Sequence, residues 1–337
     1  MTPVRVAVDA MGGDGAPQEI VAGALAAASA EVVPVLYGPR DMLGPLAGGL
    51  EIVHADQVVA MDEKPSDAVR EKRESSLFLA CRAVHDGTAD AVVGAGNTGA
   101  MLAAGLLEIR RLPDVHRPAI AVPIPALGGP SILIDAGANA DARPEHLLQF
   151  AHMGATFAEE ILGIAQPEVR LLSIGEEAEK GSQLALEAHE LLRASALHFS
   201  GNTESRRLLE GDADVVVTDG FTCNVALKAL EGTILTLLDS LLAEIGASAR
   251  GRLGGLLIRP AARRVRTRLD PETYGGAYLL GLRGLVVIAH GSSSRVAIAN
   301  ATRMAARGVE HRLVERLAAR LPTGRVEGTA DGTAVER

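Results

Sequence analysis

Aromatic residues are scarce in this chain of 337 residues: they make up 2% of it, and tryptophan is absent. A protein that binds single-stranded nucleic acid needs aromatic side chains on which the bases stack and a basic groove that follows the phosphates. The formal net charge of −9 at pH 7 has the opposite sign. We therefore expect no nucleic acid partner.

Cysteine is also scarce, because Cys81 and Cys223 are the only two in the sequence. Two cysteines exclude a disulfide framework and a cysteine-rich zinc site. Hydrophobic residues make up 47% of the chain, but no run of them is long enough for a membrane-spanning helix. A predicted strand that contains polar residues follows Met1 almost directly. We therefore expect no secretory signal and a cytoplasmic location.

One stretch, residues 213–232, shows the design that recurs along the chain. The β-branched run Val215–Val217 is typical of a buried parallel strand. Asp219 and Gly220 then turn the chain, and the Thr222 hydroxyl is the expected cap of a helix that continues to about residue 245. Apolar residues of that helix recur at helical spacing: Val225, Leu227, Leu230, Ile234 and Leu237. Such a turn presents unpaired N–H groups to an anion, although taken alone it is also an ordinary connection between strand and helix.

Strands alternate with helices almost throughout. The predicted strands cover residues 4–8, 32–37, 51–53, 91–93, 119–124, 131–134, 169–174, 197–199, 215–217 and 285–288. The charged run at 71–74 is expected to start an exposed helix, and one long helix is expected from the residues after 294 to about 321. This alternation predicts an α/β fold, a three-layer α/β/α sandwich with a mainly parallel sheet. We expect one catalytic domain over residues 1–321 and a disordered tail over 322–337, which lacks apolar periodicity.

Glycines and polar residues follow most of the predicted strands. In an open parallel sheet the ligand binds beyond the carboxyl ends of the strands. We therefore expect one site at one edge of the sheet. Its candidates by position are Asp9, Gly12, Gly13, Asn97, Asp135, Asn139, Lys180, Asp219, Asn224 and His290.

Residues 94–99 read Gly-Ala-Gly-Asn-Thr-Gly between a strand and a helix, which matches a dinucleotide-binding pattern. That pattern normally opens the first strand–helix–strand unit, but here it lies far along the chain. The acidic residue wanted at the end of the next strand is missing, and Asp114 precedes that strand. A dinucleotide-dependent dehydrogenase is an alternative that these features disfavour.

A segment without Asp or Glu interrupts the acidic chain at residues 246–269. Its seven arginines are Arg250, Arg252, Arg259, Arg263, Arg264, Arg266 and Arg268. Leucines and other apolar residues are interleaved with them. We expect this helical arm, at about residues 240–270, to meet an anionic partner, either a membrane surface or an acidic protein. The plain alternative is a solvated helical arm.

Six short blocks, in order, resemble one bacterial family, the phosphate acyltransferases, which are acyl-ACP:phosphate transacylases of phospholipid synthesis. The resemblance covers about residues 4–305. The blocks are residues 7–14 with 16–17, 96–100, 137–139, 175–177 with 180–181, 218–222 with 224–228, and 290–293. The chain departs from the family pattern over 201–207 and at Gly15, Cys223 and Ser294, where His, Gly and Asn are usual.

The resemblance implies transfer of a long fatty acyl group from acyl carrier protein (ACP) to inorganic phosphate, with no cofactor. The acyl phosphate would pass to a membrane glycerol-3-phosphate acyltransferase, so we expect peripheral contact with the inner face of the cell membrane, and a homodimer. The implied fold is similar to isocitrate-dehydrogenase-like and phosphotransacetylase enzymes. A short-chain phosphotransacetylase and a non-catalytic, membrane-attached organiser of lipid enzymes are alternatives.

The implied reaction needs no covalent enzyme intermediate, because phosphate can attack the already activated thioester directly. The protein must hold the phosphate and stabilise the oxyanion. The catalytic candidates are Lys180, Asn224 and His290, with Lys180 first because it is a cation. The plain alternatives are a solvated helix residue for Lys180 and a capping or core histidine for His290. The substrate-binding candidates are Asp9, Gly12, Gly13, Asn97, Thr98, Asn139, Asp219, Gly220 and Ser292.

Two remaining expectations concern residues around this site, and a third concerns the arm. The aspartates Asp9, Asp135 and Asp219 should orient Lys180 or cap glycine turns; they could also hold a divalent metal, but the reaction needs none and we expect none. Cys223 should take no part in the reaction, rather than act as a nucleophile that carries the acyl group.

In the arm we expect membrane contact by Leu253, Leu256, Leu257 and Ile258. We expect Arg259, Arg263 and Arg264 to bind the carrier protein as well.

Overall fold

A computed structural model describes residues 2–269 and 271–321 of the chain. Within these ranges eleven strands form one sheet: β1 Val4–Asp9, β2 Val32–Gly38, β3 Glu51–His54, β4 Ala91–Gly94, β5 Ala119–Ala126, β6 Gly129–Ile134, β7 Val169–Ser173, β8 Phe199–Glu204, β9 Val215–Val217, β10 Ala277–Leu280 and β11 Leu285–Ile288. The helices are α1 Gln18–Ala27, α2 Arg40–Leu43, α3 Pro65–Glu71, α4 Ser76–His85, α5 Thr98–Ala104, α6 Pro144–Phe157, α7 Gln183–Arg193, α8 Gly220–Gly246, α9 Ala249–Leu269, α10 Arg295–Glu310 and α11 Leu313–Arg320. The predicted tail at 322–337 lies outside the described residues.

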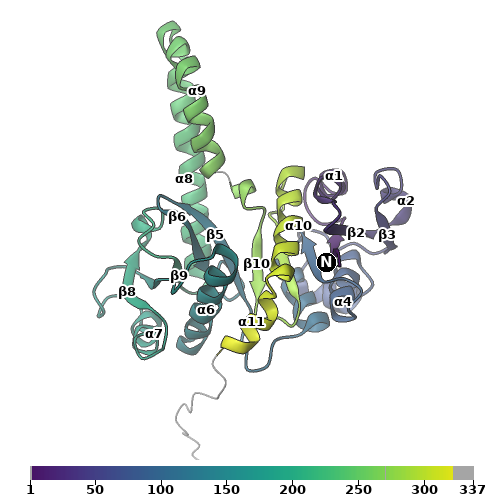
Figure 1. Cartoon of the computed structure of the whole chain (residues 1–337), viewed down its shortest axis with the longest axis horizontal. Helices are drawn as coiled ribbons and strands as arrows, with labels where there is room; N and C mark the ends of the chain where they lie inside the picture. The colour runs from purple at the N-terminus through teal and green to yellow at the C-terminus, as the bar shows by residue number, and fades with distance from the viewer. Residues whose placement is uncertain (1, 270, 322–337) are drawn as a thin grey trace, which may run out of the picture.

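Helices cover both faces of the sheet (Figure 1). On one face α1, α6, α7, α10 and α11 enclose the largest hydrophobic cluster, to which alternate residues of the strands contribute, such as Val6, Val8 and Ile134. The intervening residues point to the other face, where they pack with α4, α5 and the start of α8. Seven of the ten strand pairings are parallel. The predicted three-layer sandwich with a mainly parallel sheet is therefore confirmed.

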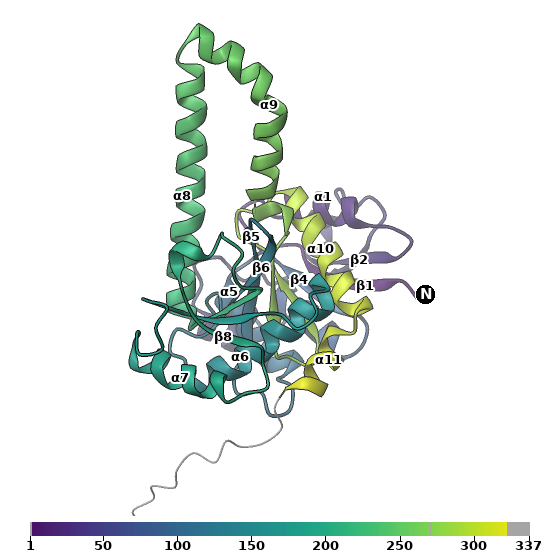
Figure 2. The same ribbon diagram turned by 60° about the vertical axis from the view of Figure 1, so that its left-hand side comes forward.

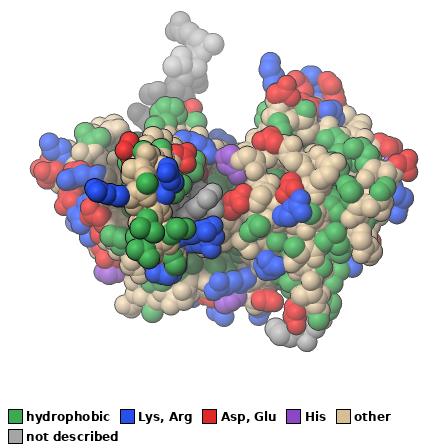
Figure 3. Space-filling model, turned by 90° about the horizontal axis from the view of Figure 1, so that it is seen from above, with side chains coloured by type: hydrophobic (Ala, Val, Ile, Leu, Met, Phe, Trp, Pro, Cys, Tyr) green, Lys and Arg blue, Asp and Glu red, His purple; other side chains and the backbone are tan. Residues whose placement is uncertain are grey.

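The second half of α8 and the whole of α9 stand away from the sandwich as two neighbouring helices (Figure 2). We call residues 233–269 the arm. Hydrophobic and basic side chains gather where the arm points toward the viewer (Figure 3). Its exposed large apolar residues include Leu235, Leu237, Leu241, Leu242, Leu253, Leu256, Leu257, Ile258 and Val265. None of the helices in the described ranges combines the length and hydropathy that crossing a bilayer requires.

The two halves of the sheet run in opposite directions. β1, β2, β3, β4 and β11 are parallel to one another, and so are β6, β7, β8 and β9. Three antiparallel pairings, β11 with β10, β10 with β5 and β5 with β6, separate these two sets. An odd number of reversals leaves the second set antiparallel to the first. The prediction of a single carboxyl edge is therefore wrong, because strand direction does not show in hydrophobic patterning.

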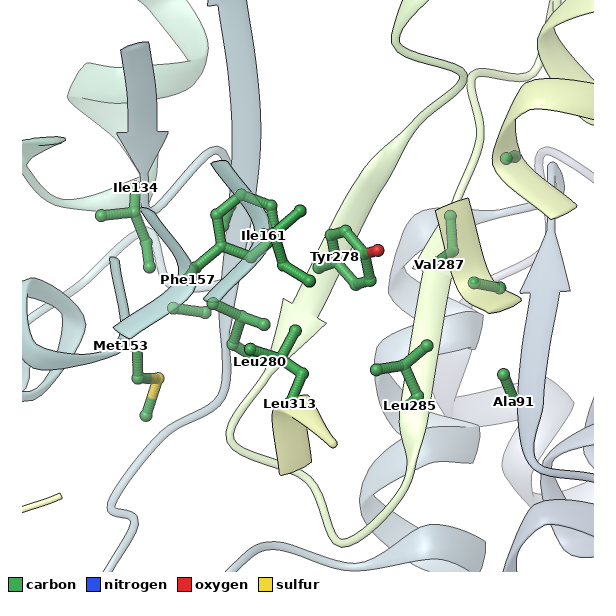
Figure 4. Packing of buried hydrophobic residues seen from close by; sticks show 14 of the residues in the cluster. Ala91, Ile134, Met153, Phe157, Ile161, Tyr278, Leu280, Leu285, Val287 and Leu313 are labelled. Atoms are coloured by element: carbon green, nitrogen blue, oxygen red, sulfur yellow. The ribbon is translucent and has the colours of Figure 1, made fainter. Parts of the chain in front are cut away.

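Strand β10 makes two of the three reversals, and sequence patterning does not predict it because its four residues are apolar without alternation. It is anchored by Tyr278, whose ring meets that of Phe157 edge-on with centroids 5.0 Å apart (Figure 4). The Tyr278 hydroxyl donates a hydrogen bond to the Met304 carbonyl, so this buried polar group is satisfied. β10 therefore joins α6 and α10 through the middle of the core.

Several predicted boundaries are also wrong. The charged run 71–74 ends α3 and links it to α4, because Pro65 at the first turn starts the helix earlier. The strand predicted at 197–199 begins at Phe199 and continues to Glu204. The long C-terminal helix is interrupted at Arg312, whose left-handed conformation (φ 54°) separates α10 from α11. Local patterning misses such breaks because the apolar spacing continues across them.

Candidate active site

The loops that follow β1, β4 and β11 pack tightly against one another. A Cβ on Gly12 would lie 2.8 Å from the Gly96 nitrogen, and one on Gly13 would lie 3.1 Å from the Gly291 carbonyl oxygen. Gly13 also has a φ of +107°, which disfavours any side chain. The amide of Asp14 donates to the Gly291 oxygen at 2.8 Å. We call Gly12, Gly13, Gly96 and Gly291 the glycine junction.

This junction explains the dinucleotide-like pattern without a nucleotide. Gly96 is required by its contact with the Gly12 backbone, since its Cβ would lie 3.2 Å from the Gly12 Cα. Gly99 lies against Pro65, whose Cγ would be 2.6 Å from a Cβ at that position. Close approach of protein to protein thus accounts for two of the three glycines in the pattern.

Unpaired amide groups remain around the junction. Within the part of the chain that the structure describes, no hydrogen bond is recorded for the backbone N–H of Gly12, Gly13, Thr98 or Gly99. Thr98 and Gly99 begin α5, where the first N–H groups have no partner within the helix. Four such donors near one another suit an anion such as phosphate.

Asn97, by contrast, uses its whole side chain within the protein. Its Oδ1 accepts from the Ala100 amide at 3.0 Å and caps α5. Its Nδ2 donates to the carbonyls of Met61 and Glu63 at 2.9 and 2.8 Å. Asn97 therefore fastens the segment before α3 over the junction, and its contribution to a ligand site is to shape it.

A second group of predicted residues surrounds the ends of β6 and β9. The buried Asp135 carboxylate accepts four hydrogen bonds: from the amides of Ile120, Ala138 and Asn139 and from Asn139 Nδ2. Burial raises the pKa of Asp135, while these donors oppose that shift. Asn139 also donates to the Pro118 carbonyl at 2.8 Å. Asp135 and Asn139 thus build the loop, because the Asp135 carboxylate and the Asn139 Nδ2 group are both bonded within the protein.

The start of α8 differs from the prediction. Asp219, not Thr222, is the N-cap: its Oδ1 accepts from the Thr222 amide at 2.9 Å, and its Oδ2 accepts from the Thr222 hydroxyl at 2.6 Å. The Asp219 carboxylate, one step before the helix, accepts from both the amide and the hydroxyl of Thr222, so that hydroxyl is a donor here and not the cap. The Gly220 amide donates to the Asn139 carbonyl at 2.8 Å. These groups position α8 and leave few free amides at its first turn.

Two other predicted residues, Cys223 of α8 and Asp9 at the end of β1, are buried. Burial, with the nearby carboxylates of Asp135 and Asp219, raises the pKa of the Cys223 thiol well above its usual value. The low-pKa thiol that a helix N-terminus could create is therefore not found at Cys223. Asp9 is buried behind the glycine junction, accepts from the Met11 amide at 3.3 Å, and has its pKa raised by burial. It caps a turn as expected.

Lys180 lies on an exposed loop after β7 and is free of partners: in residues 2–269 and 271–321 its ammonium group has no recorded hydrogen bond or ion pair. The loop itself is held firmly. Ser173 donates to the Lys180 carbonyl at 2.9 Å, and Asn202 Nδ2 donates to the Glu177 carbonyl at 2.8 Å. In the described residues Asp9, Asp135 and Asp219 make no recorded hydrogen bond or ion pair with Lys180, so of the two roles expected for them the one observed is the capping of turns.

Helix α8 links the two groups of residues. It begins at the end of β9 and passes Asn224, which lies against Gly137. One turn later Lys228 Nζ lies 3.1 Å from Nε2 of His290, in the loop after β11. His290 Nδ1 in turn lies 2.8 Å from the Ser292 hydroxyl. Sequence reasoning missed Lys228, although its spacing of four from Asn224 places both on one face of the helix.

The predicted residues therefore form two groups rather than one. The first is Asp9, Gly12, Gly13, Asn97, Thr98, His290 and Ser292. The second is Asn139, Lys180, Asp219, Gly220 and Asn224. Of these, Thr98, Lys180, Asn224, His290 and Ser292 are exposed. The described residues contain no group of three or more His, Cys, Asp or Glu side chains that could hold a metal ion.

Solved structures share this fold. A phosphotransacetylase from Streptococcus pyogenes superimposes with a TM-score of 0.62 at 17% identity, covering 91% of this chain and 94% of that one. A phosphotransacetylase from Staphylococcus aureus gives a TM-score of 0.59 at 18% identity, with the same coverage. The architecture is thus that of the phosphotransacetylase fold, as the sequence predicts.

Sequence comparison identifies the family. The family described as "Fatty acid synthesis protein" matches residues 4–316. The chain is 47% identical to the phosphate acyltransferase of Heliobacterium modesticaldum over 96% of this chain and 99% of that protein. It is 48% identical to the phosphate acyltransferase of Moorella thermoacetica, with coverage of 93% and 95%. The chain belongs to the phosphate acyltransferase family, and it is an acyltransferase.

Proposed function

We propose that this acyltransferase moves a long-chain fatty acyl group from ACP to inorganic phosphate and supplies acyl phosphate for phospholipid synthesis. The observation that supports it most is the set of unpaired amides at Gly12, Gly13, Thr98 and Gly99, beside His290 and Ser292. Such donors bind an oxyanion without needing a metal or a dinucleotide. Membership of the phosphate acyltransferase family supports the same reaction.

The proposed chemistry is a direct displacement. An oxygen of HPO₄²⁻ attacks the thioester carbonyl carbon, the C–S bond breaks, and the phosphate proton ends on the carrier thiol. Lys180 stabilises the oxyanion, since its ammonium group is exposed and unpaired within the described chain. Asn224 and His290 are the candidates to assist the oxyanion or to pass the proton to sulfur.

The remaining substrate-binding candidates form two sets, according to whether their polar groups already bond within the protein. Gly12, Gly13, Thr98 and Ser292 are proposed to contact phosphate directly. The other proposed members act by holding the loops in place, because their polar groups already bond within the protein: Asp9, Asn97, Asn139, Asp219 and Gly220. No cofactor enters the proposed reaction.

We propose that the arm brings the enzyme to the inner face of the cell membrane, where a membrane glycerol-3-phosphate acyltransferase would use the product. Four apolar side chains of α9 are largely exposed, Leu257 at 80%, with Leu253, Leu256 and Ile258 beside it. Exposed apolar surface interleaved with arginine suits an anionic bilayer. The exposed Arg259, Arg263 and Arg264 would also serve the acidic carrier protein. A cytoplasmic homodimer with peripheral membrane contact is the proposed state.

The test of the proposed reaction is release of free thiol from long-chain acyl-ACP with and without inorganic phosphate. The proposal expects release only when phosphate is present. Parallel reactions with short-chain and long-chain acyl-CoA separate the alternatives. Preference for short-chain acyl-CoA would make the protein a phosphotransacetylase instead, and thiol release without phosphate would contradict both.

A further inference from the structure

Lys228 has two partners on different halves of the molecule. Its Nζ donates to Glu231 Oε2 at 2.8 Å on its own helix, and it lies 3.1 Å from His290 Nε2 in the loop after β11. The side chain remains 48% exposed, so solvent and solutes reach the ammonium group. An ammonium group has three N–H donors. The third has no recorded partner in the described parts of the chain.

Contacts on both sides of the ring fix the orientation of His290. An ammonium group can only donate, so His290 Nε2 accepts from Lys228. On the other side of the ring, Nδ1 lies 2.8 Å from the Ser292 hydroxyl and accepts from the Ser292 amide at 3.3 Å. Lys228 and Ser292 together therefore hold the imidazole in one orientation.

A short series of contacts links Lys228 to the loop that carries the unpaired amides of Gly12 and Gly13. His290 precedes Gly291, which packs on Gly13 and accepts from the Asp14 amide. Gly291, the residue after His290, therefore touches the loop that carries the free N–H groups of Gly12 and Gly13. The Lys228 ammonium group adds a charged donor to a set whose other members, the backbone amides, are neutral.

The choice of lysine is itself informative. Of the 33 basic residues in the chain, four are lysines: Lys64, Lys72, Lys180 and Lys228. Arginine serves at nearly every other position, including surface ion pairs such as Arg193 with Glu190. A compact ammonium can donate to a carboxylate, an imidazole and a third acceptor at once, whereas the planar guanidinium directs its donors in a fixed fork. At position 228 two of these three acceptors are present, the Glu231 carboxylate and the His290 imidazole, and one N–H donor remains for a third.

We infer that Lys228 is a phosphate-binding residue: its third N–H donates to a phosphate oxygen while its bond to His290 positions the imidazole beside that phosphate. The inference rests on the proposed function, in which phosphate binds at the glycine junction. It assigns the cation of the first group of residues, as Lys180 is the cation of the second. Phosphate would thus be bound by loops of one half of the sheet and by Lys228 of α8, a helix that begins in the other half.

The variants Lys228→Met and Lys228→Arg test this, with Arg193→Met as the matched control because it removes an exposed cation from another ion pair of the i,i+3 type. Lys228→Met should raise KM for phosphate about tenfold to hundredfold, the loss expected for one hydrogen bond from a charged donor. KM for acyl-ACP should stay within about twofold. Lys228→Arg should recover part of the loss, and Arg193→Met should match the wild type. A structural role alone would not move one KM and spare the other.

A second measurement does not depend on turnover. Titration of inorganic phosphate, followed by ³¹P NMR line broadening, should show binding to the wild type and to Arg193→Met, and weaker binding to Lys228→Met. Unfolding of Lys228→Met would leave Lys228→Gln and Lys228→Arg to be measured in the same way. Equal phosphate binding by wild type and folded charge-removing variants would overturn the inference, as would an unchanged KM for phosphate. A wild type that binds phosphate through Lys228 but releases no thiol would instead contradict the proposed reaction alone.

Discussion

The ammonium nitrogen of Lys228 lies 3.1 Å from Nε2 of His290, and this contact joins two halves of a sheet whose strands run in opposite directions. Asp219 caps α8 at the end of β9, and two turns later the same helix reaches the loop after β11. The position of the site therefore depends on how α8 is capped and packed as well as on the strand ends themselves.

Replacing Lys180 by Ala should lower turnover by about 10²- to 10³-fold, the effect of losing an oxyanion partner. The melting temperature should not change, because the ammonium group makes no recorded bond to the described part of the protein. Steady-state kinetics with thermal melting checks both. Glu179→Ala, an exposed neighbour on the same loop, is the control and should retain wild-type turnover. Wild-type turnover in Lys180→Ala would remove Lys180 from the site.

Cys223 should prove dispensable for the reaction. Its thiol is buried and its pKa is raised well above the usual value, so a thiolate nucleophile is disfavoured. Cys223→Gly should stay active but melt at a lower temperature, since glycine costs about 1 kcal/mol in a helix and leaves a cavity. Cys223→Ala should restore much of that stability. An acyl group trapped on Cys223 and detected by mass spectrometry would contradict this account.

Changing Leu253, Leu256, Leu257 and Ile258 together to Ser or Gln should lower co-sedimentation with anionic vesicles about tenfold or more, because apolar insertion and arginine attraction act together. Turnover of acyl-ACP in solution should survive. A variant with polar residues at three exposed apolar positions of the sandwich, Met42, Leu107 and Leu127, is the control and should still bind vesicles. Equal loss of vesicle binding and solution turnover would assign the arm to carrier docking or to a dimer interface.

The pairing of Glu19 with Arg295 should make stability depend on pH in acid. The Arg295 guanidinium lies 2.5 Å from the Glu19 carboxylate, and this hydrogen bond, with that of the Arg295 amide, lowers the pKa of Glu19 from 4.5 to about 2. A carboxyl with a lowered pKa in the folded state contributes stability above its unfolded pKa and loses it as the pH falls toward the folded value. The difference in urea midpoint between wild type and Glu19→Gln should therefore be constant above about pH 4.5 and shrink toward pH 2. A difference that does not vary over that range would show that the charge of Glu19 adds nothing.

Much of the fold could be predicted from local patterning. Buried β-branched runs such as Val215–Val217 and the glycines after them predict strands, turns and the sandwich. Strand direction is different, because it depends on pairings between distant segments, and the short strand β10 that reverses the sheet carries no periodic signal. The expectation of one edge failed for that reason.

Sequence position names candidate residues for the site, but it does not show what each of their polar groups bonds to. Asn97, Asn139 and His290 all follow a strand, so their sequence positions do not distinguish them. In the structure the side chains of Asn97 and Asn139 bond within the protein, whereas His290 is exposed. Lys228 follows no strand, so a search of strand ends could not find it. Its contact with His290 exists only because a helix from one half of the sheet crosses to the other.

The most direct measurement of the central claim uses long-chain acyl-ACP and inorganic phosphate labelled with ¹⁸O at all four oxygens. If a phosphate oxygen attacks the thioester carbonyl, mass spectrometry should find acyl phosphate that retains all four labels, formed in equal amount to the free carrier thiol. Free fatty acid without acyl phosphate, or thiol released in excess over labelled product, would contradict direct transfer to phosphate.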